Sequence, residues 1–312
     1  MSDNKSIYKQ FCEEEKNVPL FLKYKWFDAM YSDEEWSVSV AHKGGNVQGF
    51  LPYVVTKKKG FTIITPQFLS PYQGVYFNYP TDQKYANRLG FEKEVINELI
   101  EQLPAMNAFK QNFLPQFTNW LPFQWKGYKQ TTRYTYIIND LSDKEVIFSN
   151  FKDNIRREIR KAEKALVVKE GDDIELMFRM KQDVYEANKE DYPIPLGKLK
   201  NVFDYCQQNN CGELLVAKDN DGNIHSILLY VWDNQSAYYL HGVTALGFKT
   251  TGSMSLLLWE AIQRSATKTK AFNFEGSMVE PIERYFRAFG GIQTPYFQIS
   301  KTDSKILKLL KY

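Results

Sequence analysis

The sequence lacks the residues that build metal centres and disulfide frameworks. Its 312 residues include only three cysteines and three histidines, and no two cysteines form a Cys-x-x-Cys pair. No histidine stands at metal-ligand spacing from them, so we expect neither a structural metal nor disulfides. The N-terminal segment has no apolar core of a signal peptide, and no apolar run reaches membrane-spanning length. These absences predict a cytoplasmic protein in a reducing compartment.

An excess of charge of one sign is also missing. The net charge of +3 gives the whole chain no field that would attract nucleic acid, so any anion site has to be local. What the sequence does have is core material: 43% hydrophobic residues, with 20 Tyr and 22 Phe. This composition is typical of a globular protein, and the length is sufficient for two domains.

The two halves of the chain show the same order of predicted elements. In the first half, Trp36–Ala41 and Val47–Thr56 alternate as strands around a Gly-Gly turn. In the second half, Glu213–Lys218 and Ile224–Trp232 flank an Asp-Gly turn in the same way. A third strand, a helix and a further strand follow each hairpin. Two copies of one α+β unit are the simplest explanation.

An aromatic-rich stretch separates the two copies. It contains Phe113, Phe117, Trp120, Phe123, Trp125, Tyr128, Tyr134 and Tyr136. We favour packing between domains over a ligand-stacking platform as the role of these rings. We place the domains at residues 1–143 and 144–312, with the boundary near Leu141–Lys144.

The stretch Ala271–Ser300 contains a position that is typical of a ligand site. Ala271–Phe274 is predicted as a buried strand, and a helix is expected from about Glu280 to Phe289. Glu275 therefore follows the carboxyl end of a strand, where open α/β sheets usually bind their ligands. A turn or helix-capping carboxylate is the alternative interpretation of Glu275.

Two other stretches are suited to anions. The loop from Gly247 to Ser253 leads into a helix N-terminus, which presents free N–H groups and the positive end of the helix dipole. A plain turn with a Thr or Ser cap is the alternative there. The helix around Asn154–Lys164 carries the densest basic cluster, including Arg156, Arg160 and Lys164. That cluster is either a site for a phosphate-bearing ligand or a solvated helix face.

Three motifs resemble those of the GNAT acyltransferase fold and of its FemAB-like branch, which joins two such units in tandem. They are NIRREIRKAEK at Asn154–Lys164, AFNFEGS at Ala271–Ser277 and YFRAFGG at Tyr285–Gly291. The resemblance implies an α+β fold of two tandem GNAT-like domains, each with a mixed, mostly antiparallel sheet flanked by helices. It also implies that the strands at Tyr238–Val243 and Ala271–Glu275 are parallel neighbours that splay apart and admit an acyl donor.

The resemblance also assigns residues to roles. The pyrophosphate of acyl-CoA would bind at Val243, Lys249, Thr250, Thr251, Gly252 and Ser253. Met254 departs from the small residue that the GNAT loop has at this point. Many GNAT enzymes carry a Tyr that protonates the leaving thiolate, but Phe286 occupies that position, and the adjacent Tyr285 is expected about 100° around the helix. Arg287 takes the basic position of the FemAB-like motif, where a cation would stabilise an oxyanion.

The function implied is N-acyl transfer, in which the acyl group passes directly to an acceptor amine. His241 and Glu275, at the mouths of the splayed strands, are the candidate bases, and no nucleophile motif indicates a covalent acyl-enzyme. We expect acyl-CoA as the donor and an acceptor on a cell-envelope or sugar-nucleotide precursor, with Arg156, Arg160, Lys164 and Tyr285 as substrate-binding residues. The alternatives are a transferase that uses aminoacyl-tRNA on a peptidoglycan precursor, and a non-catalytic ligand-binding protein.

Overall fold

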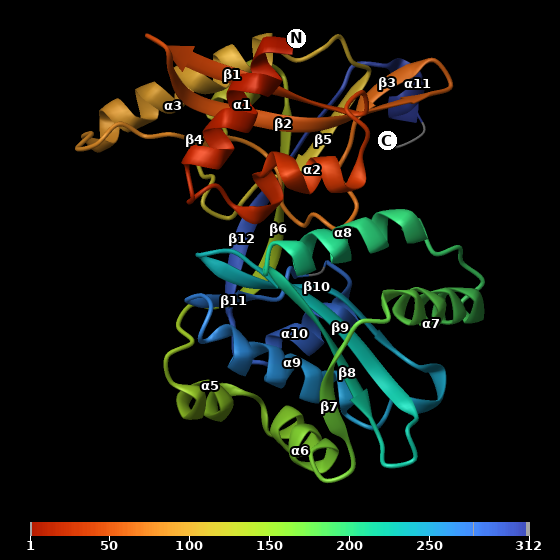
Figure 1. The fold of residues 1–312 in the computed structure, drawn as a ribbon. Coiled ribbons are helices and arrows are strands. Elements are labelled where there is room, and N and C mark those ends of the chain that lie inside the picture. The colour runs from red at the N-terminus through yellow and green to blue at the C-terminus, as the bar shows by residue number, and fades with distance from the viewer. Residues whose placement is uncertain (1, 277, 310–312) are drawn as a thin grey trace. The chain divides into compact units, whose positions relative to one another are not determined.

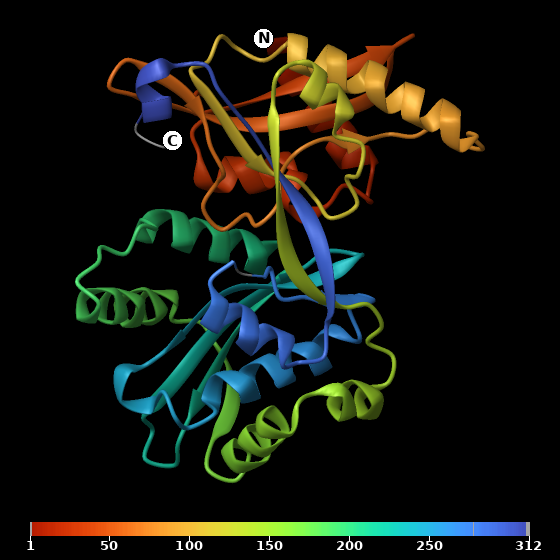
Figure 2. The ribbon, with the colours of Figure 1, turned by 180° about the vertical axis from the view of Figure 1, so that it is seen from behind.

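The structure is a computed structural model that describes residues 2–276 and 278–309 (Figures 1 and 2). The chain divides into two compact units, unit 1 with Met1–Arg133 and Pro295–Tyr312, and unit 2 with Tyr134–Thr294. Ser277, which belongs to the AFNFEGS motif, lies outside the described residues. The expected domain limits differ from these units, because residues 134–143 belong to unit 2 and residues 295–312 belong to unit 1.

The difference arises from the last strand of each repeat. Strand β6 (Lys129–Ile138) follows the first repeat in the chain, yet it pairs with β11 (Ala271–Asn273) in unit 2. Strand β12 (Ile292–Thr302) follows the second repeat, yet it pairs with β5 (Ala108–Asn112) in unit 1. Each sheet is therefore completed by a strand from the other repeat, which a boundary drawn along the sequence does not reveal.

In unit 1 the strand order is β1 (Trp36–Lys43), β2 (Asn46–Lys58), β3 (Phe61–Ile64), β5 and β12. The β3–β5 pair is parallel, whereas the pairs β1–β2, β2–β3 and β5–β12 are antiparallel. The short strand β4 (Tyr76–Phe77) pairs with β2. The helices are α1 (Ser2–Glu14), η1 (Leu20–Leu22), α2 (Tyr24–Met30), α3 (Tyr85–Glu101), α4 (Leu121–Trp125) and α11 (Lys305–Leu309).

Two apolar clusters form the core of unit 1. One combines residues of α1 and α2 with β1 and β2, among them Tyr8 and Trp36. The other combines α3 and α4 with β2, β3 and β5, and it takes in four rings of the aromatic-rich stretch: Phe113, Phe117, Phe123 and Tyr128. These rings build the interior of one unit, which corrects our expectation that they pack between domains.

In unit 2 the strand order is β6, β11, β10 (Ser236–Thr244), β9 (Ile224–Trp232), β8 (Gly212–Lys218) and β7 (Val167–Gly171). Its one parallel pair among the described strands is β10–β11. The helices are α5 (Lys144–Asn150), α6 (Asp153–Ala162), α7 (Ile174–Ala187), α8 (Leu196–Gln208), η2 (Leu246–Phe248), α9 (Ser253–Ser265) and α10 (Glu280–Arg287). The mixed, mostly antiparallel sheets confirm the expected fold class.

Helices cover both faces of the unit 2 sheet (Figure 1). Leu228 and Tyr230 of β9 belong to an apolar cluster with residues of α5, α6, α9 and α10. Their neighbour Val231 points to the opposite face, where it lies near Cys206 of α8 at Gly212. Because alternate residues of a strand point to opposite faces, each position on β10 is assigned to one of these two helical layers.

Candidate functional site

Strands β10 and β11 separate soon after they meet. They pair in parallel over three positions, Ser236 with Ala271, Ala237 with Phe272 and Tyr238 with Asn273. Strand β11 then ends, whereas β10 continues to Thr244. The splayed geometry that the resemblance implied is therefore present. Beyond Tyr238, the edge of β10 has backbone groups that a bound ligand can reach.

A β-bulge interrupts β10 where the two strands part. Tyr239 lies opposite Tyr230 of β9, and His241 lies opposite the next residue, Leu229. The intervening Leu240 is therefore the extra residue of the bulge. Since Tyr230 and Leu229 face opposite sides of the sheet, Tyr239 and His241 do so too, although residues two apart in a regular strand share a face.

The two faces of β10 consequently carry different chemistry. Tyr239 packs on Phe286 of α10, with ring centroids 5.3 Å apart. His241 faces the α7–α8 layer, where its Nε2 lies 2.6 Å from the hydroxyl of Tyr192. Burial lowers the pKa of His241 well below its usual value, and the nearby Lys181 charge lowers it further. His241 is therefore neutral at pH 7 and is a weaker base than its unperturbed pKa had indicated.

A cavity of about 300 Å³ lies at the N-terminus of α9. It is lined by Glu158, Thr244, Lys249, Thr250, Gly252, Ser253, Met254, Ser255 and Tyr285. We call it the loop cavity. Gly252 caps the helix in the left-handed conformation (φ 75°), and no side chain bonds to the first N–H groups. Those groups have no partner within the helix, so they are available to an anion.

Only glycine fits at position 252. Besides the positive φ, a Cβ there would lie 3.0 Å from the carbonyl oxygen of Glu158 on α6. The α9 loop is thus packed directly against the basic helix.

Tyr285 reaches the loop cavity from α10. Its hydroxyl lies 3.0 Å from Ser255 Oγ, and Ser255 donates to Glu158 Oε2 over 3.0 Å. Because Ser255 has one hydroxyl proton, Tyr285 is the donor in the first of these bonds. Burial raises the pKa of Tyr285, and Tyr239 and Glu158 raise it further, against the opposing hydrogen bond with Ser255. The phenol therefore keeps its proton at neutral pH, while Phe286 lies in the apolar core.

Glu275 stands where the chain leaves β11. It has a positive φ of 60°, and its backbone N–H donates to Asn273 Oδ1 over 2.8 Å. Its Oε1 is buried with no hydrogen-bond partner among the described residues, and burial raises its pKa well above the usual value. The next residue, Gly276, fits because a Cβ would lie 2.1 Å from the carbonyl oxygen of Tyr134. Glu275 does not line the loop cavity, but its charge acts on Tyr239.

Arg287 lies on the exposed side of α10 and away from the residues that line the loop cavity. Its Nε donates to Glu283 Oε1 over 2.9 Å. The structure therefore does not bring Arg287 to Tyr285. Four predicted cofactor-binding residues do line the loop cavity, but Val243 is buried in the strand and Thr251 bonds to the carbonyl oxygen of Phe248 over 2.8 Å.

The predicted substrate-binding arginines lie in a second, more open hollow of about 440 Å³. It is formed by α5, α6 and α9, and we call it the basic hollow. Arg156, Arg160 and Lys144 line it together with the rings of Phe148 and Trp259. Lys164 is exposed after the end of α6 and lines neither space.

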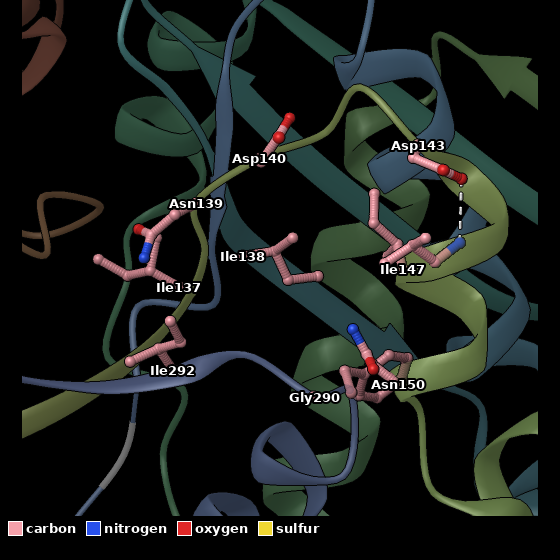
Figure 3. A pocket seen from close by; sticks show the side chains of 11 residues that line it. Ile137, Ile138, Asn139, Asp140, Asp143, Ile147, Asn150, Gly290 and Ile292 are labelled. Atoms are coloured by element: carbon pink, nitrogen blue, oxygen red, sulfur yellow. Dashed lines mark hydrogen bonds between the residues drawn. The ribbon is translucent and has the colours of Figure 1, made fainter.

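A third cavity, of about 280 Å³, contains none of the predicted site residues (Figure 3). It lies between β6, α5 and Gly290, and its Asp143 is occupied as the cap of α5. Among residues 2–276 and 278–309, no group of His, Cys, Asp and Glu is arranged to hold a metal ion. In the same part of the chain, no helix is long and apolar enough to cross a membrane.

Comparison with known proteins identifies a domain family that the second half of the chain matches. Residues 149–277 match the model of the acetyltransferase (GNAT) domain. Unit 2 contains a GNAT acetyltransferase domain. The match includes Glu158, the loop cavity's helix α9 and Glu275, and it ends before Tyr285.

Solved structures resemble the chain over nearly its full length. FemX is 14% identical, with 99% of this chain and 98% of that chain covered and a TM-score of 0.69. L-PGS from Bacillus licheniformis is 11% identical (98% and 94% covered, TM-score 0.56). A tandem GNAT protein from the clavulanic acid biosynthesis pathway is 9% identical (97% and 96% covered, TM-score 0.52). At these identities the likeness establishes the tandem fold alone, and a search of curated protein sequences found no match.

The structure adds residues around the loop cavity that we did not predict. Ser255 and Glu158 link Tyr285 to the α9 loop. Burial raises the pKa of Tyr239, and the charge of Glu275 raises it further. One signal was present in the sequence, because Ser255 is a serine inside the apolar run of α9. In the structure its side chain is 2% exposed. A buried serine within an apolar helix face usually has a specific partner.

Proposed function

We propose that the protein is an N-acyltransferase that moves an acyl group from acyl-CoA to an acceptor amine. The position of the Tyr285 hydroxyl in the loop cavity carries this proposal. A protonated phenol there can donate to a leaving thiolate, while the free N–H groups of α9 and the Lys249 ammonium attract the donor's phosphates.

The chemistry follows from the gap between β10 and β11. A thioester lying in that gap meets the amine at β10, and backbone N–H groups near the bulge stabilise the oxyanion of the tetrahedral intermediate. When the intermediate collapses, Tyr285 gives its proton to the sulfur. The raised pKa of Glu275 suits it to accept the proton that leaves the attacking nitrogen. The acceptor is an amine on a cell-envelope or sugar-nucleotide precursor. Arg287 has no part in these steps.

Acetyl-CoA provides the first test. A ligand that binds only the folded state raises its stability by about 2.7 kcal/mol at a concentration 100 times Kd. We expect the melting temperature to rise with millimolar acetyl-CoA, and thiol release to follow when primary amines are added. If acetyl-CoA at these concentrations leaves the melting temperature unchanged, CoA is not the donor.

A second donor is favoured by one observation. Glu158 places a carboxylate in the loop cavity, where it repels a diphosphate but would pair with the α-ammonium of an aminoacyl group. Such a donor is the aminoacyl-tRNA of the FemAB-like proteins that this sequence resembles. The RNA phosphates would then lie along the basic hollow.

The two donors predict salt dependences of different steepness. Binding of aminoacyl-tRNA weakens steeply between about 50 and 200 mM salt, because phosphate contacts release counterions. Filter binding of aminoacyl-tRNA at those two salt concentrations separates the donors. The measurement is repeated with the Arg160→Gln variant and with acetyl-CoA as a competitor. If neither donor binds, the protein is a non-catalytic member of this fold.

A further inference from the structure

A cluster on the face of β10 opposite Tyr285 has no role in the steps above. Phe178, Lys181 and Tyr185 lie on one face of α7, at spacings of three and four residues. The rings of Phe178 and Tyr185 pack on Tyr192, with centroids 5.5 and 5.2 Å apart. Tyr192 stacks on His241 at 5.8 Å. This face of α7 is thereby directed at the part of β10 that has separated from β11.

Lys181 stands out among the partly buried lysines of the chain. Lys268 pairs with Glu213, and Lys5 pairs with Asp33 over 2.8 Å. Lys181 has no carboxylate partner among the described residues, and burial alone lowers its pKa to about 8. Its amine is thus available in the neutral form slightly above neutral pH.

The neighbouring groups are poorer proton acceptors than Lys181. Burial raises the pKa of Tyr192, with a smaller contribution from Tyr185, so Tyr192 stays protonated. Its hydroxyl lies 2.6 Å from Nε2 of His241, and burial together with the Lys181 charge lowers the pKa of the imidazole well below its usual value, so His241 is a weak base. Lys181 lies close enough for its charge to lower the pKa of His241 further, and the Lys181 amine is the stronger base of the two.

We propose that Lys181 takes the proton that the acceptor ammonium loses before its nitrogen attacks, and that Tyr192 and His241 position this base beside the gap. The inference rests on the proposed N-acyl transfer. The ammonium R–NH₃⁺ and the neutral Lys181 amine become R–NH₂ and the Lys181 ammonium, and Lys181 then releases the proton to solvent. The second nitrogen proton passes to Glu275 during attack, and Tyr285 protonates the leaving thiolate. Glu275 then releases its proton to solvent, and Tyr285 takes one up. The base and the acid therefore act from opposite faces of β10.

Competitive labelling tests Lys181 without any substrate. Acetic anhydride reacts with neutral amines, so mass spectrometry of labelled peptides across pH 6–11 gives a titration curve for each lysine. We expect half-maximal labelling of Lys181 near pH 8, against about 10.4 for an ordinary lysine. A curve that coincides with those of the other lysines would overturn the inference.

The second test measures turnover. Acetyl-CoA and a panel of primary amines are the substrates, and the rate of thiol release is measured. Lys181→Met and Lys181→Arg should each lower kcat/KM at pH 7.5 by about 100-fold or more and remove the inflection near pH 8 from the profile. The arginine variant keeps the charge, so an equal loss assigns the effect to the base. Lys200→Met on α8, which removes an ion pair with Glu175, is the control for charge loss.

A failure of the Lys181 inference can be distinguished from a failure of the proposed acyl transfer. If the wild type releases thiol and Lys181→Met retains the rate and the inflection, the inference is wrong while acyl transfer stands. If the wild type releases no thiol with any amine, CoA-dependent transfer is wrong, and the labelling curve still decides the state of Lys181.

Discussion

The two units have the same sheet and differ in how its strands are connected. The order β1, β2, β3, β5, β12 in unit 1 corresponds to β8, β9, β10, β11, β6 in unit 2. In both, the third and fourth strands are the parallel pair. The pattern of strand directions is thus shared, so the scaffold alone does not make a GNAT site.

The connection after the third strand shows the difference most clearly. In unit 2, eight residues (245–252) join β10 to α9, and the last is Gly252 in the left-handed conformation. In unit 1, residues 65–84 join β3 to α3, and the helix is preceded by Lys84 in an extended conformation. A short loop ending in glycine holds the first N–H groups of α9 at a cavity. The longer connection of unit 1 ends in no left-handed glycine at α3.

The residues after the fourth strand differ in the same sense. Unit 2 continues from β11 through the buried Phe274 to Glu275, which has a positive φ of 60° and a buried carboxylate oxygen. Unit 1 continues from β5 through the buried Phe113 to Leu114, which packs against an apolar cluster. The candidate site residues therefore lie in unit 2, and unit 1 provides matched controls.

The largest effect is expected from removing the Tyr285 hydroxyl. Tyr285→Phe leaves the ring in place but removes the proton donor, so kcat should fall by about 10²- to 10⁴-fold. Tyr128→Phe makes the same change in a buried ring of unit 1 and should leave kcat unchanged. Steady-state thiol release measures both variants. Equal rates for Tyr285→Phe and the wild type would exclude Tyr285 as the acid.

Buried carboxylates in the two units should respond oppositely to neutralisation. The folded state raises the pKa of Glu275, so its contribution to stability is present below the unfolded pKa of about 4.3 and is lost as pH rises toward the folded pKa. Glu275→Gln should therefore stabilise the protein above about pH 5, by about 1.4 kcal/mol per unit of pKa shift.

Glu92 in unit 1 is the control. It accepts hydrogen bonds from Tyr79 (2.7 Å), Arg88 (3.0 Å) and Asn119 (2.9 Å). Glu92→Gln should destabilise the protein, because it breaks a buried charge-assisted network. Thermal unfolding from pH 4.5 to 9 measures both. A Glu275→Gln variant that is less stable than wild type at pH 8 would mean that the carboxyl has a partner.

A smaller effect separates backbone strain from ligand binding. Gly252 and Gly60 have similar positive φ values (75° and 81°), but only Gly60 has open space around its Cβ position. Alanine at either site should cost about 1–2 kcal/mol of stability. Only Gly252→Ala should also abolish the donor-induced rise in melting temperature, since it displaces the α9 loop from Glu158. An undiminished rise would place the donor elsewhere.

The smallest expected effect identifies the donor. Glu158→Gln removes a negative charge from the loop cavity and can still accept the Ser255 hydrogen bond. It should strengthen acyl-CoA binding, or weaken binding of an aminoacyl donor, by about 0.2–1 kcal/mol, roughly a 1.5- to 5-fold change in Kd. Isothermal titration calorimetry measures Kd for each donor and shows whether the substitution strengthens or weakens binding. Glu94→Gln on the exposed side of α3 in unit 1 should leave Kd unchanged.

Much of the fold was predictable from local patterns. The β1–β2 and β8–β9 hairpins were expected from alternation and from their glycine turns, and β10, α6 and α9 lie close to the predicted ranges. Helices α7 and α8 were not predicted, although they supply Lys181 and the segment that holds Tyr192. Their role depends on which face of β10 they cover, which local periodicity does not indicate.

The sequence by itself determined the two repeats, the glycine loop before α9 and the carboxylate after β11, because these features depend on residues close together in the chain. Only the tertiary structure decided that Tyr285 enters the loop cavity while Arg287 does not, and that the bulge sends Tyr239 and His241 to opposite faces. It also decided which strand completes each sheet. These outcomes depend on strand register and on contacts between distant residues, and so they are absent from any local pattern.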